Sequence, residues 1–243
     1  MDNGKKTYTE GIKVESKFAK WFDNYWYHYK WITIGIVFFI AVVIICTLQM
    51  GEKKKEDITI LYAGPYQLSA REVNSLQGVF NAVMPEDFDE SGEKHTSIVE
   101  YLIYSDEQIK EIEAQTDADG HRLDVNNQSV TDNYKNYYDY IVLGETAICL
   151  VDEHLYGELS KYGRLLPLVT ALGEDSGYES DDYGLYLGST GLYKEYSALR
   201  VLPKDTVICI LRQTVVGKIS KDENYQHELD MFKAIVNYGK DAE

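Results

Sequence analysis

The chain has 243 residues, a formal net charge of −16 at pH 7 and 44% hydrophobic residues. Residues 1–30 carry a net charge of +2 and residues 51–243 a net charge of −18, so nearly all of the acidity lies after residue 50. Nucleic acids and anionic lipids would repel so acidic a segment, which excludes both as its partners.

The first predicted element is an amphipathic aromatic helix within the N-terminal tail, over about residues 17–30. Its aromatic residues recur at spacings of three and four, which places them on one face beside several lysines. Aromatic rings and lysine side chains favour the lipid headgroup layer. We therefore predict a helix that lies in the membrane interface through Trp21, Phe22, Tyr25, Trp26, Tyr29 and Trp31. The alternative is a simple aromatic belt preceded by a disordered tail.

The second element is a predicted transmembrane helix at residues 31–50, which contain no Asp, Glu, Lys or Arg. Twenty residues at about 1.5 Å each span about 30 Å, the thickness of the bilayer core. A cleaved signal peptide has a shorter apolar region nearer the N-terminus. A lipoprotein anchor needs Gly or Ala before its cysteine, whereas Ile45 precedes Cys46. We expect a retained, single-pass signal anchor.

The positions of the lysines give a small bias in orientation. Four lysines lie in the twenty residues before the span and three in the twenty after it. The positive-inside rule then favours a cytoplasmic N-terminus and an extracellular C-terminal domain.

A charged linker at 51–57 leads into a predicted domain at 58–243. Strands are predicted at 58–63, 98–104, 147–151, 184–187 and 206–213, and helices at 69–84, 105–115, 130–143, 153–162 and 224–238. Ser69 and Glu72 form a capping-box pattern at the first of these helices. Strands that alternate with helices predict an α/β fold, here a single three-layer domain with a mostly parallel sheet.

One acidic turn has the spacing of a calcium-binding loop. Asp87, Asp89 and Ser91 occupy alternate positions before Gly92, as oxygen ligands do in such loops. The twelfth position, however, is Ile98 instead of a bidentate glutamate. Calcium is therefore one hypothesis and a solvated acidic turn is the other; no other cofactor is indicated.

The sequence holds no motif of nucleophilic, metal-dependent or P-loop catalysis, so we do not expect an enzyme. Cys149 and Cys209 lie inside apolar, strand-like runs. Two buried free cysteines are expected there, and a bridge between neighbouring strands is the alternative in an oxidising compartment.

The segment Tyr134–Leu168 resembles a part of extracellular solute-binding proteins of the type 2 periplasmic-binding class. In both, a helix ends at a Gly-acid step, here Gly144-Glu145, and a strand, an acidic residue and a short helix follow. The segment closes on Leu166-Pro167-Leu168. The whole chain is similar to membrane-anchored proteins of Gram-positive bacteria, which implies an outward-facing domain. Fewer than forty residues separate Leu168 from the strand predicted at 206–213, so the resemblance implies a single lobe.

These observations predict a membrane-tethered binding module with an unidentified ligand. Its expected partners are the lipid bilayer and a small solute, or a membrane transporter or sensor complex. The alternative is a non-catalytic structural or protein-interaction module that has lost ligand binding. A concave pocket at the carboxyl ends of the strands favours the first, and a filled surface favours the second.

Overall fold

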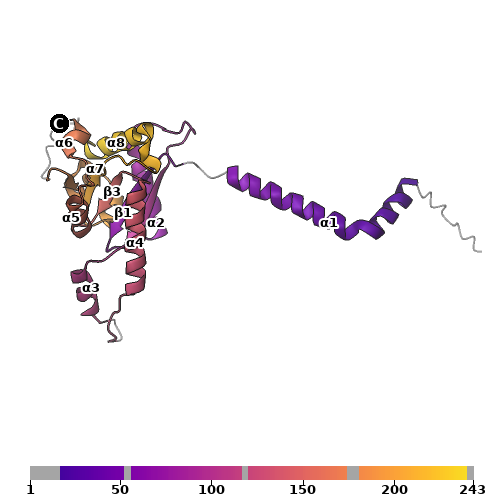
Figure 1. Cartoon of the computed structure of the whole chain (residues 1–243), viewed down its shortest axis with the longest axis horizontal. Helices are drawn as coiled ribbons and strands as arrows, with labels where there is room; N and C mark the ends of the chain where they lie inside the picture. The colour runs from indigo at the N-terminus through magenta and orange to yellow at the C-terminus, as the bar shows by residue number, and fades with distance from the viewer. Residues whose placement is uncertain (1–16, 52–55, 117–119, 174–180, 240–243) are drawn as a thin grey trace, which may run out of the picture. The chain divides into compact units, whose positions relative to one another are not determined.

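The computed structural model describes residues 17–51, 56–116, 120–173 and 181–239. The chain divides into two compact units, residues 1–54 and residues 55–243, and each is described by itself. Figure 1 shows the helices and strands with the labels used below.

The described part of the first unit is a single helix, α1 (Lys17–Gly51), which contains both the aromatic and the apolar segment. The stretch Asn24–Cys46 is long enough and apolar enough to cross a membrane, and it begins seven residues earlier than predicted. Tyr25 stacks on Trp21 and on Tyr29 with ring centroids 5.7 and 5.4 Å apart, and the Tyr25 and Thr33 hydroxyls are 2.8 Å apart. The other aromatic residues predicted at the interface are exposed: Trp21, Phe22, Trp26, Tyr29 and Trp31.

The second unit is built on a five-stranded sheet of order β2-β1-β3-β5-β4. Its strands are β1 (Ile58–Gly64), β2 (Thr96–Leu102), β3 (Ile148–Val151), β4 (Gly184–Tyr186) and β5 (Val207–Ile210). β1 pairs in parallel with β2 and with β3, whereas β5 is antiparallel to β3 and to β4. Four strands therefore run in one direction and β5 runs against them, which confirms a mixed α/β fold with a mostly parallel sheet.

The described α-helices of this unit are α2 (Ala70–Val83), α3 (Asp106–Glu113), α4 (Asn127–Leu143), α5 (Glu153–Lys161), α6 (Leu168–Leu172), α7 (Gly191–Glu195) and α8 (Asp222–Val236). Most of them, though not α6 and α8, begin at a residue whose side chain caps the first turn. The capping box of Ser69 and Glu72 is confirmed at α2. Asn126 accepts a hydrogen bond from the Ser129 N–H at 3.1 Å, and α4 therefore starts three residues earlier than predicted.

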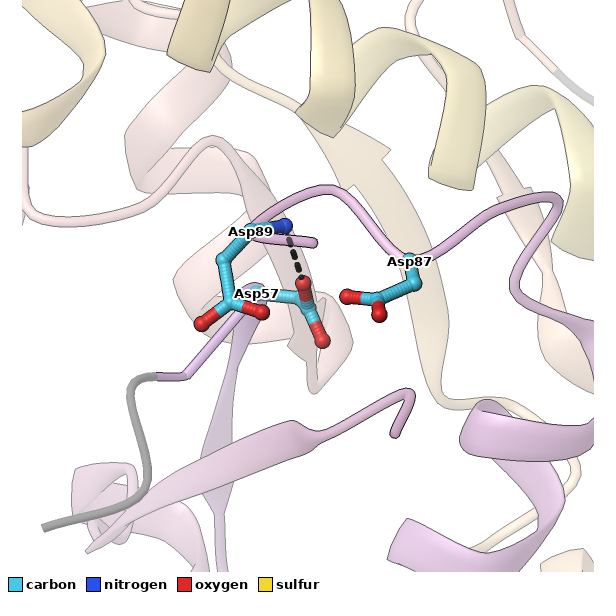
Figure 2. A group of neighbouring side chains, drawn as sticks. All are labelled: Asp57, Asp87 and Asp89. Atoms are coloured by element: carbon cyan, nitrogen blue, oxygen red, sulfur yellow. Dashed lines mark hydrogen bonds between the residues drawn. The ribbon is translucent and has the colours of Figure 1, made fainter. Parts of the chain in front are cut away.

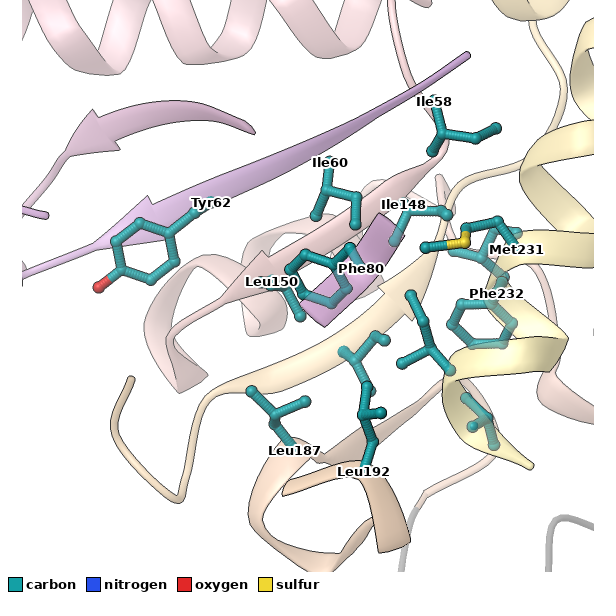
Figure 3. Close-up of a cluster of buried hydrophobic side chains, with 14 of the residues drawn as sticks. Ile58, Ile60, Tyr62, Phe80, Ile148, Leu150, Leu187, Leu192, Met231 and Phe232 are labelled. Carbon is teal, nitrogen blue, oxygen red and sulfur yellow. The ribbon is translucent and has the colours of Figure 1, made fainter. Parts of the chain in front are cut away.

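Two apolar clusters cover opposite faces of the sheet, because successive side chains of a strand point to opposite sides. Ile58, Ile60 and Tyr62 of β1 pack with residues of α2, α7 and α8 in the first cluster, which Figure 3 shows. Leu61 and Ala63 pack with residues of α4 and α5 in the second. β1, β3 and β5 are buried along their whole length, as expected for strands covered on both faces.

Some strand limits differ from the predictions. β2 begins and ends two residues early, and β5 stops at Ile210 because Leu211 forms an isolated bridge with Leu165 instead. Cys149 and Cys209 are free and buried, as predicted, and they face each other directly across β3 and β5. Burial and a contact with the Cys209 thiol raise the pKa of Cys149, so both cysteines belong to the core.

Candidate functional site

The carboxyl ends of β1 and β3 meet at a topological switch point. Strand β2, which follows β1 in the chain, lies on one side of β1 in the sheet, and β3 lies on the other side. Open α/β sheets bind ligands in the crevice at such a point. A cavity of about 100 Å³ is found there, with room for about three water molecules. Its lining residues are Tyr62, Gly64, Pro65, Gln108, Asp152, Pro203, Asp205 and Thr206.

Tyr62 brings an unpaired hydroxyl to this cavity. The residue is only 2% exposed, and among the described residues its hydroxyl has no hydrogen-bond partner. Figure 3 shows the hydroxyl at one end of the core cluster, turned away from the apolar side chains. Burial raises the pKa of Tyr62 above its ordinary value, the nearby backbone N–H of Tyr66 lowers it in part, and the charge of Asp152 raises it to a lesser extent. The group is therefore a neutral hydroxyl that can both donate and accept a hydrogen bond.

Two carboxylates give the cavity its negative charge. Asp152 is the N-cap of α5, where one carboxylate oxygen accepts from the Leu155 N–H at 2.9 Å. The other oxygen accepts from the Gln108 side-chain amide at 3.4 Å. Asp205 is exposed on the turn before β5. No lysine or arginine is among the described residues that line the cavity.

An open hollow of about 460 Å³ continues along the same edge of the sheet. The two sites are adjacent because Glu153 follows Asp152 and Val207 follows Thr206 in the chain. The hollow is lined by Glu153, Tyr156, Asp181, Gly184, Leu185, Tyr186 and Val207. The Tyr186 hydroxyl donates to Glu153 at 2.7 Å, and the Tyr156 hydroxyl donates to Asp181. Two hydrogen-bonded pairs of a tyrosine and a carboxylate thus lie along this edge of the sheet.

The predicted calcium ligands lie elsewhere, at the start of β1. The structure brings Asp87 and Asp89 together and adds Asp57, so that carboxylate oxygens of all three lie within 4.8 Å of one another (Figure 2). Asp57 accepts from the backbone N–H groups of Asp89 at 2.9 Å and of His95 at 2.7 Å. The Ser91 hydroxyl instead donates to the Glu93 carbonyl at 3.1 Å. Backbone N–H groups therefore already use several of these oxygens.

The calcium hypothesis predicts that millimolar Ca²⁺ raises the melting temperature of the wild-type chain by several degrees, since a ligand of the folded state stabilises it. The same Ca²⁺ concentration should have little effect on Asp89→Asn, which keeps the size of the side chain and removes its charge. A thermal melt followed by circular dichroism, with Mg²⁺ as the comparison, measures both. An unchanged wild-type melting temperature would leave the solvated acidic turn as the interpretation.

Searches with the chain found no matching protein family, no matching curated protein and no matching solved structure. The resemblance of Tyr134–Leu168 to solute-binding proteins therefore stays a prediction. The interpretation of the site depends on the geometry of its own residues. Tyr62, Gln108 and Asp205 were not singled out in the sequence, and their only signal was their position next to the end of a strand.

Proposed function

We propose that this protein is a membrane-tethered binding module for a small cationic solute. In this proposal α1 crosses the bilayer as a signal anchor, with its aromatic segment in the membrane interface. The C-terminal unit is a three-layer α/β domain that resembles one lobe of a solute-binding protein and faces outward. The small excess of lysines before the span supports this orientation.

The observation that carries the proposal is the acidic cavity at the switch point, with the buried Tyr62 hydroxyl beside Asp152 and Asp205. A buried hydroxyl without a partner costs about 1–3 kcal/mol, which a bound polar group would recover. An ammonium group is a compact donor of three hydrogen bonds and fits a cavity of about 100 Å³. The rest of an amine would lie in the adjoining hollow, against the rings of Tyr156 and Tyr186.

The proposal predicts that putrescine binds the full-length chain in detergent, whereas 1,4-butanediol of the same length does not. Asp152→Asn should weaken putrescine binding about tenfold or more, because Asn still caps α5 but carries no charge. Tyr62→Phe should weaken it several-fold. Isothermal titration calorimetry at low salt measures these affinities.

Asp139→Asn, an exposed carboxylate on α4, is the matched control and should bind putrescine like the wild type. Equal affinity for the diamine and the diol, or an unchanged Asp152→Asn, would contradict the proposal. Absence of any amine binding would favour the alternative function, a structural or protein-interaction module of a membrane complex.

A further inference from the structure

A second concave site, the α4–α5 groove, lies between helices α4 and α5. It has a volume of about 330 Å³, which is in the range of small-ligand pockets. Its lining residues are Tyr134, Tyr137, Tyr138, Ile141, Val142, Glu158, Leu159, Tyr162 and Arg164.

The middle of the groove is apolar and aromatic. Tyr137, Ile141 and Leu159 form a buried floor, with exposed fractions of 3%, 3% and 4%. Tyr138 from α4 and Tyr162, which ends α5, form the walls and are 50% and 66% exposed. Tyrosine rings offer apolar contact area together with a polar tip, and such side chains are frequent in binding surfaces.

The floor also contains a polar group without a partner. The Tyr137 hydroxyl has no hydrogen bond to any described residue, although the side chain is almost wholly buried. Because this hydroxyl has almost no accessible surface, it lies beneath the floor, and a molecule in the groove would contact the tyrosine rings.

The two ends of the groove carry opposite charges. At one end the Glu158 carboxylate accepts from the Tyr134 hydroxyl at 2.8 Å, and at the other the Arg164 guanidinium donates to the Ile141 carbonyl at 3.1 Å. Tyr134 and Ile141 are seven residues apart on α4, which corresponds to about 10 Å along the helix axis. The cavity at the switch point, in contrast, has carboxylates and no basic residue among its described lining.

We propose that the α4–α5 groove binds a short zwitterionic peptide of about three residues, with its ammonium group at Glu158 and its carboxylate at Arg164. Three residues of extended chain span about 10 Å, which is close to the rise between Tyr134 and Ile141, the residues that the two charged groups contact. Arginine binds carboxylates through parallel N–H donors, and the peptide between the charged ends would pack against the tyrosine rings of the walls. This site is separate from the amine site and does not depend on it.

The experiment is a calorimetric titration of the full-length chain with trialanine, N-acetyl-trialanine and trialanine amide. Blocking either terminus should weaken binding about tenfold. Glu158→Gln should bind trialanine and its N-acetylated form equally, and Arg164→Gln should bind trialanine and its amide equally. Each variant should still bind the peptide that is blocked at the opposite end more weakly than it binds trialanine. A general loss of folding would not produce this pattern.

Tyr162→Ala replaces an exposed wall residue, should leave the circular dichroism spectrum unchanged, and should weaken trialanine binding several-fold. Glu111→Gln on α3 and Arg71→Gln on α2 are exposed matched controls and should bind like the wild type. The proposal is overturned if trialanine does not bind, if both blocked peptides bind as tightly as trialanine, or if Asp152→Asn abolishes peptide binding while Glu158→Gln does not. It is also overturned if the groove variants change only the oligomeric state in sedimentation velocity. A failure of putrescine binding alone leaves it intact.

Discussion

The Gly217→Ala variant should lose about 4 kcal/mol or more of its free energy of unfolding, a large share of the about 5–15 kcal/mol by which native domains are stable. Gly217 has φ 81° and ψ −165°, a conformation that is essentially restricted to glycine. A Cβ atom at this position would lie 1.6 Å from the Leu143 carbonyl oxygen and 2.8 Å from that of Gly144. Both contacts are with backbone, so no side chain can move aside.

The matched control is Gly173→Ala. Gly173 also has a positive φ, of 79°, but no atom of the described residues lies within 4 Å of its would-be Cβ. It should lose only about 1 kcal/mol, the cost of a left-handed conformation in a residue with a side chain. Urea unfolding of the full-length chain in detergent, followed by far-ultraviolet circular dichroism, measures both variants. Equal losses would mean that the segment around Gly217 rearranges easily.

The Glu228→Gln variant should be more stable than the wild type at pH 8 and about equally stable near pH 4. Glu228 lies on α8, is 1% exposed, and one of its carboxylate oxygens has no partner among the described residues. The other oxygen accepts from the Thr146 hydroxyl at 3.3 Å. Burial raises the pKa of Glu228 to about 7, although the nearby charge of Lys218 lowers it in part.

The sign of the effect follows from proton binding. The folded state holds the Glu228 proton up to about pH 7, whereas the unfolded state releases it near the ordinary glutamate pKa of 4.5. Stability therefore falls as the pH rises between these two values, and the loss is complete above pH 7. This difference in pKa corresponds to about 3 kcal/mol, which the neutral glutamine removes.

Urea unfolding at a series of pH values tests this expectation, with Glu111→Gln as the control for an exposed carboxylate. The difference between Glu228→Gln and the wild type should grow between pH 4.5 and 7 and then stay constant. The control should show a small difference at every pH. A Glu228→Gln chain that is less stable than the wild type at pH 8 would show that the charged carboxylate stabilises the fold.

Local patterns predicted most elements of the fold because each depends on neighbouring residues. The Ser69–Glu72 box and Gly144, which ends α4 in the left-handed conformation, are examples. The direction of β5 was not predictable, since the segment before it is long enough either to cross the sheet or to turn back. The position of Glu228 could have been found: it lies four residues before Phe232 and seven before Ile235, on the buried face of α8.

The candidate sites were harder to predict because they join distant parts of the chain. Tyr62 and Asp205 line one cavity although they are 143 positions apart. Asp57 belongs to the linker in the sequence and to the carboxylate cluster in the structure. Only the topology of the sheet brings such residues together, and composition and spacing do not contain that information. Tyr134, Tyr137 and Tyr138 are close together in the sequence, but nothing in the sequence places Arg164 beside them.

The position of β5 between β3 and β4 has a consequence for biosynthesis. β3 pairs with β5, whose residues follow about sixty positions later in the chain. A nascent chain therefore carries Ile148–Val151 as an unpaired apolar edge until Ile210 has been synthesised, and such edges promote aggregation. The order of the strands therefore sets how long the apolar edge of β3 stays exposed during synthesis.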